Sequence, residues 1–428
     1  MADITGQQRT LIIDTDVEAI PGVPNGTPAE KFPEMAGGGF GINENPLFDK
    51  ADIEANLDAQ PSPEAAGFEP GGPLMIIPAP FNANNPTTTQ SWLNWMLSKV
   101  LIRTSGALDA HTISEYNPLG TGKFTRRFAG CKFDGITLSF GSNNRLAVPN
   151  LDIKGMFPEP YEPGSAPSPT FPTMRHWNFT LLGVQAGGAY DGVGSVTKEK
   201  FLRSIEIKAV NGSQHGEQSY RYRSSDGALI KGASSVNEGQ LEITGTIELK
   251  LEDYEWINRC VSGGKGHLRM LGFHGDSPVT LAQNATGFTT DPASATVIVE
   301  AEVGDGPSFA DGDTVFLENS AASDPALWKR EVLEVSGVSG DDVTLFTQGQ
   351  GDFEASVGRN QTFSTNSRMY KLGCELLIRE LTVSGWNSVG GAADKIYQRV
   401  PFRAGIWVGT HPTHGAGYTH KALDFMVR

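Results

Sequence analysis

The stretch Leu241-Glu-Ile-Thr-Gly-Thr-Ile-Glu-Leu-Lys-Leu251 decides the fold class of this chain. Its apolar side chains alternate with Glu, Thr and Lys at a period of two, which is the period of a β-strand with one buried face. The segment Ile136-Thr-Leu-Ser-Phe140 alternates in the same way and is followed by the turn Gly141-Ser-Asn-Asn144. These patterns predict amphipathic strands joined by tight turns.

Two short helices interrupt the predicted strands. Apolar residues recur at helical spacing over 91–101, and Asp253 is a capping residue for a second helix over 254–261. A hairpin is predicted within 111–156. The remaining predicted strands are 205–209, 241–251, 267–273, 297–299, 314–317, 332–335, 343–346, 372–383 and 399–407.

Composition divides the chain into four predicted segments. Residues 1–88 form a Pro-rich extended N-terminal arm, and residues 89–280 form the first part of a β-sandwich body. Residues 281–369 are an inserted acidic β-barrel or immunoglobulin-like domain, expected on the outside, and residues 370–428 complete the body and end in a tail. Residues 281–369 contain 14 acidic and 4 basic side chains, which sets them apart from the mildly basic body.

The predicted arm carries apolar residues that a purely solvated tail would lack. Leu11, Ile12, Phe40 and Phe48 are the candidates for contacts with a neighbouring subunit. A flexible leader is the alternative interpretation of this segment.

Length, charge and cysteine content exclude several classes of protein. A chain of 428 residues can bury a large core without disulfides, and three scattered cysteines cannot form a disulfide framework or a four-thiolate zinc site. The net charge of −15 disfavours tight, sequence-independent binding of nucleic acid. The first residues lack a signal peptide pattern and no stretch has the length of a membrane span, so we expect synthesis in the cytoplasm and no membrane partner.

The sequence also lacks the motifs of the common enzyme classes. Gly120-Thr-Gly-Lys123 resembles the end of a phosphate-binding loop, but Asn117 replaces the required glycine and Phe124 replaces the required Ser or Thr. His411, His414 and His420 have no spacing typical of a rigid metal site. We therefore predict no enzymatic activity, no catalytic, cofactor-binding or metal-binding residues, and no cofactor.

One region resembles a known family. The segment Phe128-Ala-Gly-Cys-Lys-Phe-Asp-Gly-Ile-Thr-Leu-Ser-Phe140, followed by Leu151-Asp-Ile-Lys-Gly155, is similar to the strand pair of major tail tube proteins from long-tailed (siphovirus-type) bacteriophages. In that family a Gly-Cys step opens one strand and a second strand ends on Gly. The resemblance covers about 91–280 and 369–405, and it does not account for the Pro-rich arm or for residues 281–369.

The resemblance implies a mainly β fold: a tail-tube-type β-sandwich, single or duplicated, with short flanking helices and the inserted small β-barrel. It implies a structural subunit that self-assembles into stacked rings, as a trimer with pseudo-sixfold symmetry or as a hexamer, and forms the conduit for DNA ejection. The expected partners are copies of the chain, tape measure, tail terminator and tail tip proteins, and DNA that passes without sequence recognition. The expected location is the virion tail.

Two further expectations concern surfaces. We expect Lys123, Arg126, Arg127 and Lys132 to form ion pairs between subunits, because like charges crowded on one strand repel each other unless acidic partners approach. The alternative function is a virion surface protein that binds a host carbohydrate or receptor through the inserted barrel.

Overall fold

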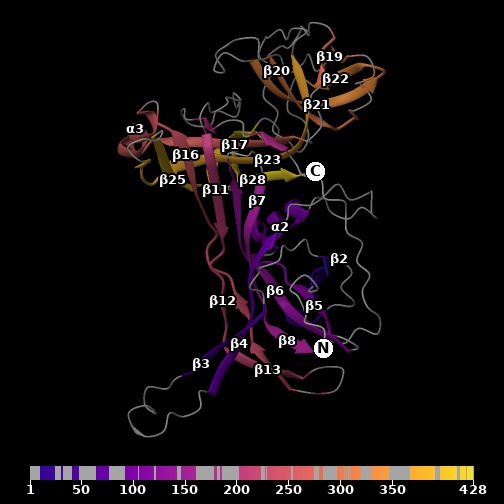
Figure 1. Cartoon of the computed structure of the whole chain (residues 1–428), viewed down its shortest axis with the longest axis vertical. Helices are drawn as coiled ribbons and strands as arrows, with labels where there is room; N and C mark the ends of the chain where they lie inside the picture. The colour runs from indigo at the N-terminus through magenta and orange to yellow at the C-terminus, as the bar shows by residue number, and fades with distance from the viewer. Residues whose placement is uncertain are drawn as a thin grey trace. The chain divides into compact units, whose positions relative to one another are not determined.

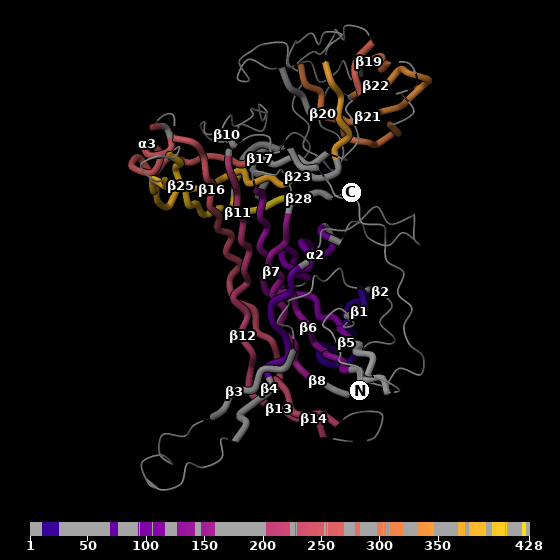
Figure 2. Tube along the Cα trace, viewed as in Figure 1, coloured from indigo at the N-terminus to yellow at the C-terminus, as the bar shows by residue number. Residues whose placement is uncertain are grey.

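The structure is a computed structural model, drawn as a cartoon in Figure 1 and as a tube along the Cα trace in Figure 2. The described residues are 10–24, 30–31, 41–47, 64–76, 92–104, 106–119, 122–141, 146–160, 178–180, 184–185, 202–222, 227, 229–251, 254–273, 279–282, 296–302, 304, 306, 309–319, 329–346, 367–390, 396–411, 415–420 and 422–427. Most of them lie in antiparallel strands, with two short helices, so the predicted mainly β fold is confirmed.

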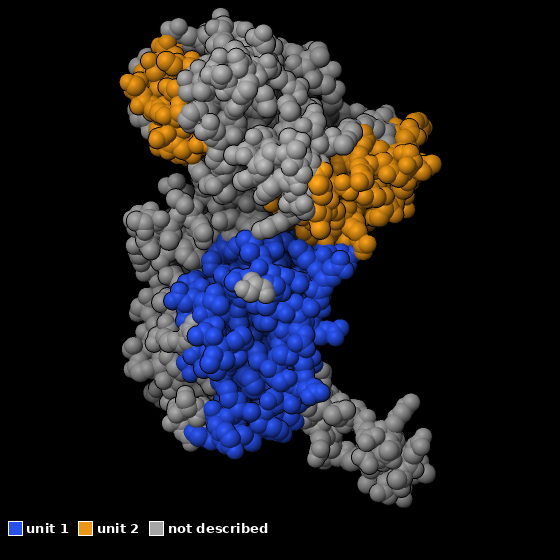
Figure 3. Space-filling view, turned by 180° about the vertical axis from the view of Figure 1, so that it is seen from behind, with its two compact units in different colours: residues 1–138, 147–174, 208–242 blue, residues 139–146, 175–207, 243–428 orange. Residues whose placement is uncertain are grey.

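The chain divides into two compact units, which Figure 3 colours separately. Unit 1 comprises residues 1–138, 147–174 and 208–242. Unit 2 comprises residues 139–146, 175–207 and 243–428. Each unit is built from segments that are distant in the sequence, as expected for antiparallel sheets with long connections.

The sheet of unit 1 is organised around the long strand β6 (Gly122–Phe140) (Figure 1). β5 (His111–Leu119) pairs antiparallel with the first part of β6. β4 (Glu64–Ile76) pairs with β7 (Leu146–Lys154). β1 (Thr10–Ile13) pairs with β5 on the edge that β6 leaves free.

The helix of unit 1, α2 (Trp92–Leu101), is confirmed where the sequence predicted it. Its apolar face is buried, and the Trp95 ring lies 5.3 Å from the Phe133 ring and 5.1 Å from the His111 ring in edge-on contacts. α2 therefore packs on β5 and β6, because the 3.6-residue periodicity places its apolar side chains on one stripe.

Shorter strands complete unit 1. They are β2 (Glu30–Lys31), β3 (Gly41–Leu47), β8 (Phe157–Pro160), β12 (Gln214–His215), β13 (Gln218–Tyr222), β14 (Leu229–Ala233) and β15 (Val236–Asn237). β13 and β14 form a separate two-stranded ribbon, and Met156, Phe157, Ile230 and Val236 form a small buried cluster beneath it.

Unit 2 is organised around the long strand β23 (Arg368–Val383). β17 (Lys265–Phe273) pairs antiparallel with its middle, and β25 (Tyr397–Ala404) pairs with its last residues. β16 (Glu242–Lys250) pairs with β25. α3 (Glu255–Ser262) begins after Tyr254, without a side-chain cap, and ends at a left-handed Gly263.

Unit 2 also contains strands outside this central set, several of them in the predicted insertion. They are β9 (Asn178–Thr180), β10 (Val184–Gln185), β11 (Leu202–Val210), β18 (Val279–Thr280), β19 (Thr296–Glu300), β20 (Thr314–Asn319), β21 (Lys329–Ser339), β22 (Asp342–Phe346), β24 (Asn387–Val389), β26 (Trp407–His411), β27 (Gly415–His420) and β28 (Asp424–Val427). β11 crosses the boundary between the units, since residues 208–210 belong to unit 1.

The region 281–369 has its own hydrophobic core but is not a closed barrel over the described residues. Its strands pair in the order β18–β23–β20–β21–β22–β19 around buried residues that include Val315, Leu333 and Leu345. The residues that follow β18 and β19 are joined by a bridge between Leu281 and Ala301. Two backbone hydrogen bonds flank it, from Ala282 N–H to the Glu300 carbonyl at 2.9 Å and from Glu302 N–H to the Thr280 carbonyl at 3.0 Å. The predicted closed barrel is therefore not seen over the described residues, in which no continuous ladder joins β18 to β19.

The two units repeat one order of elements and one pattern of pairing. The series β4, α2, β5, β6, β7 of unit 1 corresponds to β16, α3, β17, β23, β25 of unit 2. β4 pairs with β7 as β16 pairs with β25, and β5 pairs with β6 as β17 pairs with β23. The free edge of the helix-following strand is covered by β1 in unit 1 and by β9 and β10 in unit 2.

A β-bulge recurs at the same place in both units. In unit 1 it falls between the pairs His111–Cys131 and Ile113–Phe128, and in unit 2 between the pairs Gly266–Leu381 and Leu268–Ile378. In each case the long strand carries the extra residue, which increases the local twist. Gly155 follows Cys131 at the same spacing as Gly405 follows Leu381.

The Gly-Cys step differs from the expectation that it opens a strand. Gly130 lies inside β6, at the bulge, with a φ of 69°. Only glycine adopts this left-handed conformation without strain. The step therefore bends a continuous strand.

Candidate functional site

A buried carboxylate fixes the segment that follows β1 onto unit 1. Glu18 is 4% exposed and accepts hydrogen bonds from the backbone N–H of Gly130 at 3.0 Å, from Gly22 N–H at 2.7 Å and from the Thr112 hydroxyl at 2.7 Å. Burial raises the pKa of Glu18, and these hydrogen bonds oppose the rise. These hydrogen bonds hold residues 14–18 against β5 and β6, so this segment is part of unit 1.

His111 holds the same segment from the other side. Its Nδ1 lies 3.1 Å from the carbonyl oxygens of both Asp14 and Asp16, so the neutral ring donates from Nδ1. The side chain is fully buried beside Trp95 and Phe133. Burial, and then the nearby Lys99 charge, lower the pKa of His111 to about 4.

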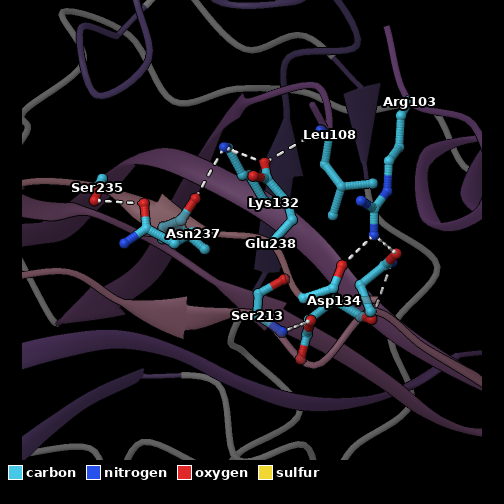
Figure 4. Close-up of polar contacts among 11 residues, drawn as sticks. Arg103, Leu108, Lys132, Asp134, Ser213, Ser235, Asn237 and Glu238 are labelled. Carbon is cyan, nitrogen blue, oxygen red and sulfur yellow. Dashed lines mark hydrogen bonds and ion pairs between the residues drawn. The ribbon is translucent and has the colours of Figure 1, made fainter. Parts of the chain in front are cut away.

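A second polar group lies around Lys132 and Glu238 (Figure 4). Lys132 is 7% exposed, and its Nζ donates to the Val236 carbonyl at 3.0 Å and to Glu238 Oε1 at 2.5 Å. Burial by itself would raise the pKa of Glu238, but the hydrogen bond and charge of Lys132 and the backbone hydrogen bonds together lower it. Leu108 N–H donates to the same oxygen at 3.2 Å.

The neighbouring group in Figure 4 joins β6 to the turn after β11. Asn211 is fully buried and donates through its side chain to the carbonyls of Val100 and Asp134, at 2.9 and 3.2 Å. Arg103 donates to Asn211 Oδ1 at 3.0 Å, and Asp134 Oδ1 accepts from Ser213 N–H at 2.7 Å. These buried polar groups are satisfied within unit 1, which is the arrangement of a structural network.

The predicted intersubunit cations have different surroundings. Arg126 is half-buried, and its guanidinium lies 2.9 Å from Glu115 on the paired strand β5. Lys132 is buried among partners of its own unit. Arg127 is half-buried opposite Ser114, and the backbone of Lys123 pairs with Pro118. An intersubunit role for these four residues stays a prediction, and the ion pairs of Arg126 and Lys132 lie within the chain.

The predicted arm residues also separate into two groups. Leu11 and Ile12 are 1% and 2% exposed in β1 and pack in the core of unit 1. β4 is likewise paired with β7. This part of the predicted arm is therefore an integral part of unit 1. Phe40 and Phe48 lie outside the described residues.

The ribbon of β13 and β14 presents apolar side chains to solvent. Tyr220, Tyr222 and Leu229 are 59%, 75% and 55% exposed, and Tyr222 pairs directly with Leu229. The other face is covered, since the Arg221 guanidinium stacks 5.0 Å from the Phe157 ring. Aromatic residues grouped on a surface are typical of protein–protein interfaces.

An ion-pair cluster lies on the solvent-facing side of β16 and β25 in unit 2. Glu248 Oε1 accepts hydrogen bonds from Arg399 at 2.8 and 2.5 Å, and Glu248 Oε2 accepts from the Ser204 hydroxyl at 3.2 Å. Arg203 lies 3.9 Å from the same carboxylate and stacks on Tyr397. Burial would raise the pKa of Glu248, but its hydrogen bonds with Arg399 and Ser204 lower it.

No group of three or more His, Cys, Asp or Glu residues that could hold a metal ion occurs among the described residues. His411 and His420 lie on the β26–β27 hairpin, and His414 is outside the described part of the chain. Within the described residues, no helix is long and apolar enough to cross a membrane.

Sequence reasoning missed Glu18, His111, Asn211 and Glu248. Glu18 lies in the predicted arm, and Asn211 lies just after the predicted strand 205–209, where an asparagine is common in turns. Glu248 is one of three glutamates or lysines on the outer side of the predicted strand 241–251, and nothing in that alternation distinguishes it. Only the pairing of β16 with β25 identifies its arginine partner.

The two units are mainly β, each has one helix and one long strand among its described residues, and the buried polar groups described above connect segments within unit 1. The phage tail tube protein family matches residues 48–323, which is more than half of the chain, and the chain belongs to this family. It is a structural tail component of a bacteriophage virion. No curated protein matches the chain.

Proposed function

We propose that this chain is the repeating subunit of the tail tube, assembled into stacked rings that form the conduit for DNA ejection. Membership of the tail tube family carries this proposal. Heterologous contacts between copies generate closed rings or continuous stacks, and a protein that builds a tube needs both. Tape measure, tail terminator and tail tip proteins are its proposed partners in the virion, and DNA passes without sequence recognition.

The internal repeat supports a ring of three copies. Each chain supplies two units with equivalent strand order, so three chains supply six equivalent units and pseudo-sixfold symmetry. A hexameric ring would place twelve such units around the bore. Symmetry of ring particles in electron micrographs separates the two, and native mass spectrometry gives the number of 45.9 kDa chains in a ring.

Electron microscopy of the purified protein tests the main proposal. Annular particles or hollow tubes are expected, whereas a protein that stays monomeric at every concentration and salt condition would contradict it. Tyr222→Ser changes an exposed side chain of the β13–β14 ribbon and should reduce tube formation while leaving the melting temperature unchanged. Val261→Ser is the matched control, because Val261 is 84% exposed on α3, away from this ribbon in the sequence and in a different unit.

We also propose that the region 281–369 projects outward from the tube. Its separate hydrophobic core and its net charge of −10 support this position, since so many like charges would repel each other within a ring interface. Replacement of residues 283–367 by a short Gly-Ser linker should keep tube assembly and reduce the outer diameter. A folded variant that forms no tubes would make this region an assembly element. Tubes that keep assembling but lose attachment to cells would favour the receptor-binding alternative.

A further inference from the structure

The arginines around Glu248 have the composition of a phosphate-binding site. Arg203 and Arg399 are 49% and 52% exposed, whereas the Glu248 carboxylate between them is 13% exposed. The Arg399 guanidinium donates to Glu248 through both Nε and Nη2. Two solvent-facing guanidinium groups therefore converge on one anionic group.

Two features hold the arginines in place. The Arg203 guanidinium carbon lies 4.7 Å from the centre of the Tyr397 ring, a stacking contact that restricts its rotamers. Arg399 lies opposite Glu248 in the β16–β25 register, and the Ser204 hydroxyl donates to the second carboxylate oxygen. Planar guanidinium groups fixed in this way suit phosphate as well as carboxylate, because both anions accept two parallel N–H hydrogen bonds.

The face on which these residues lie is a water-facing side of the sheet. Ile243, Ile247 and Leu249 of β16 point to the buried side, and Glu248 lies on the opposite side between them. The position therefore does not require a carboxylate for packing. The lowered pKa of Glu248 keeps its carboxylate charged at neutral pH, so this negative charge stays between the two arginines.

We propose that Glu248 masks a latent phosphate-binding site formed by Arg203 and Arg399, and so prevents this face of unit 2 from retaining nucleic acid. This inference rests on the proposed function, because a conduit must release the DNA that passes through it. Phosphate contacts are the main source of sequence-independent affinity for DNA. An internal carboxylate that is already bound competes with every phosphate that approaches the two arginines.

The test measures binding of a short fluorescent DNA duplex to the full chain by anisotropy at physiological salt. Glu248→Gln should bind the duplex about tenfold more tightly than the wild-type protein, because it frees two guanidinium groups for charge-assisted hydrogen bonds. Its affinity should also depend more steeply on salt, by a slope of about 0.9 for each additional phosphate group that is neutralised. Binding by the variant that equals wild-type binding would overturn the proposal.

Two further variants separate masking from a general change of charge. Glu380→Gln makes the same change in net charge, but Glu380 pairs at 2.8 Å with one lysine, Lys265, and should leave DNA binding almost unchanged. The double variant Glu248→Gln/Arg399→Gln should return to wild-type affinity. Equal gains in Glu248→Gln and Glu380→Gln would show that only net charge matters and would reject the site.

The proposed tube assembly and the proposed masking of the two arginines can be rejected independently, because they are measured separately. Tube formation is scored by microscopy, and DNA binding is scored on the same preparations before assembly. Loss of tubes in wild-type protein would reject the proposed function while the Glu248 site could still show its gain of binding. A melting curve of Glu248→Gln checks that the strands remain folded, and Glu248→Ala provides a second variant with the same expected gain.

Discussion

Unit 1 and unit 2 share the order and pairing of their central strands but place their charged side chains differently. In unit 1, Glu18, Lys132 and Asp134 are buried and hydrogen-bonded across distant segments. In unit 2, the Glu248 cluster and the Lys265–Glu380 pair lie at the surface. Among the described residues of unit 2, Arg379, which is 5% exposed and pairs with Asp424, and Glu318, which is 9% exposed, are buried exceptions.

This difference shows that two units with the same strand order and pairing can place their charged side chains differently. The same bulge in the long strand is stabilised in unit 1 by a glycine whose N–H meets a buried carboxylate. At the equivalent place in unit 2, Glu380 directs its carboxylate to Lys265 and accepts the Gly405 N–H through its backbone carbonyl at 2.8 Å. Buried polar contacts make unit 1 depend on particular side chains, whereas surface pairs contribute little stability.

The largest expected effect comes from a side chain at the bulge of unit 1. Gly130→Ala should lower the free energy of unfolding by about 4 kcal/mol, since it adds backbone strain and overpacks the core. The new Cβ would lie 2.6 Å from Met156 Sδ at a φ of 69°. Denaturant unfolding followed by far-ultraviolet circular dichroism measures the change.

Gly263→Ala is the matched control in unit 2. Gly263 has a φ of 67°, but its Cβ would meet nothing within 4 Å, so only the backbone strain remains, about 1 kcal/mol. Equal losses in the two variants would contradict the view that the bulge of unit 1 is crowded.

The second prediction concerns acid. The folded pKa of His111, about 4, lies below its unfolded value, so the fold favours the neutral ring. Its contribution is fully present above about pH 6.5 and is lost as the pH falls toward 4, by about 3 kcal/mol. Thermal melts of wild type and His111→Gln from pH 7 to pH 4 measure this loss, which should be absent in the variant.

Protonation of Glu18 in acid changes the stability of the fold in the opposite direction to protonation of His111. Because burial raises its folded pKa, protonation of Glu18 favours the folded state as the pH falls. The melts are therefore repeated in Glu18→Gln, where the His111 contribution should be seen without this opposing change. A wild-type and His111→Gln difference that does not vary with pH would exclude His111 as the titrating group.

The third prediction compares one lysine from each unit. Lys132→Met leaves Glu238 without its buried cation and should cost about 2 kcal/mol. Lys265→Met removes a cation that is 57% exposed and should cost less than about 1 kcal/mol. Chemical denaturation of both variants checks the ranking, and a larger loss in Lys265→Met would reverse the contrast between the units.

The smallest expected effect tests the repeat at equivalent glycines. A Cβ on Gly135 would lie 3.1 Å from the Ala209 carbonyl oxygen, whereas a Cβ on Gly385 would lie 3.2 Å from the Pro401 ring. Gly135→Ala should lower the free energy of unfolding by about 1 kcal/mol, because a backbone carbonyl in a sheet moves less readily than a side-chain ring to accommodate the new Cβ. Gly385→Ala should change the melting temperature little, and a larger loss there would show that the two sites are packed alike.

The strands and helices were predictable because their signals are local. Alternation over 241–251 predicted β16, and the helical stripe over 91–101 predicted α2. The second helix was also placed correctly, but the predicted cap Asp253 was wrong, because the N-cap is Tyr254 and it makes no side-chain capping hydrogen bond. The resemblance to tail tube proteins, drawn from the strand pair around Gly130, was confirmed by the family match.

The sequence by itself determined which residues have a buried face, and hence the mainly β class, because that information repeats every two or four residues. Tertiary structure decided which strands are neighbours: β1 beside β5, Glu18 beneath Gly130, and Arg399 opposite Glu248. These partners are separated by about a hundred residues or more along the chain. Periodicity gives the side of a strand on which a residue lies but carries no information about the strand that will lie next to it.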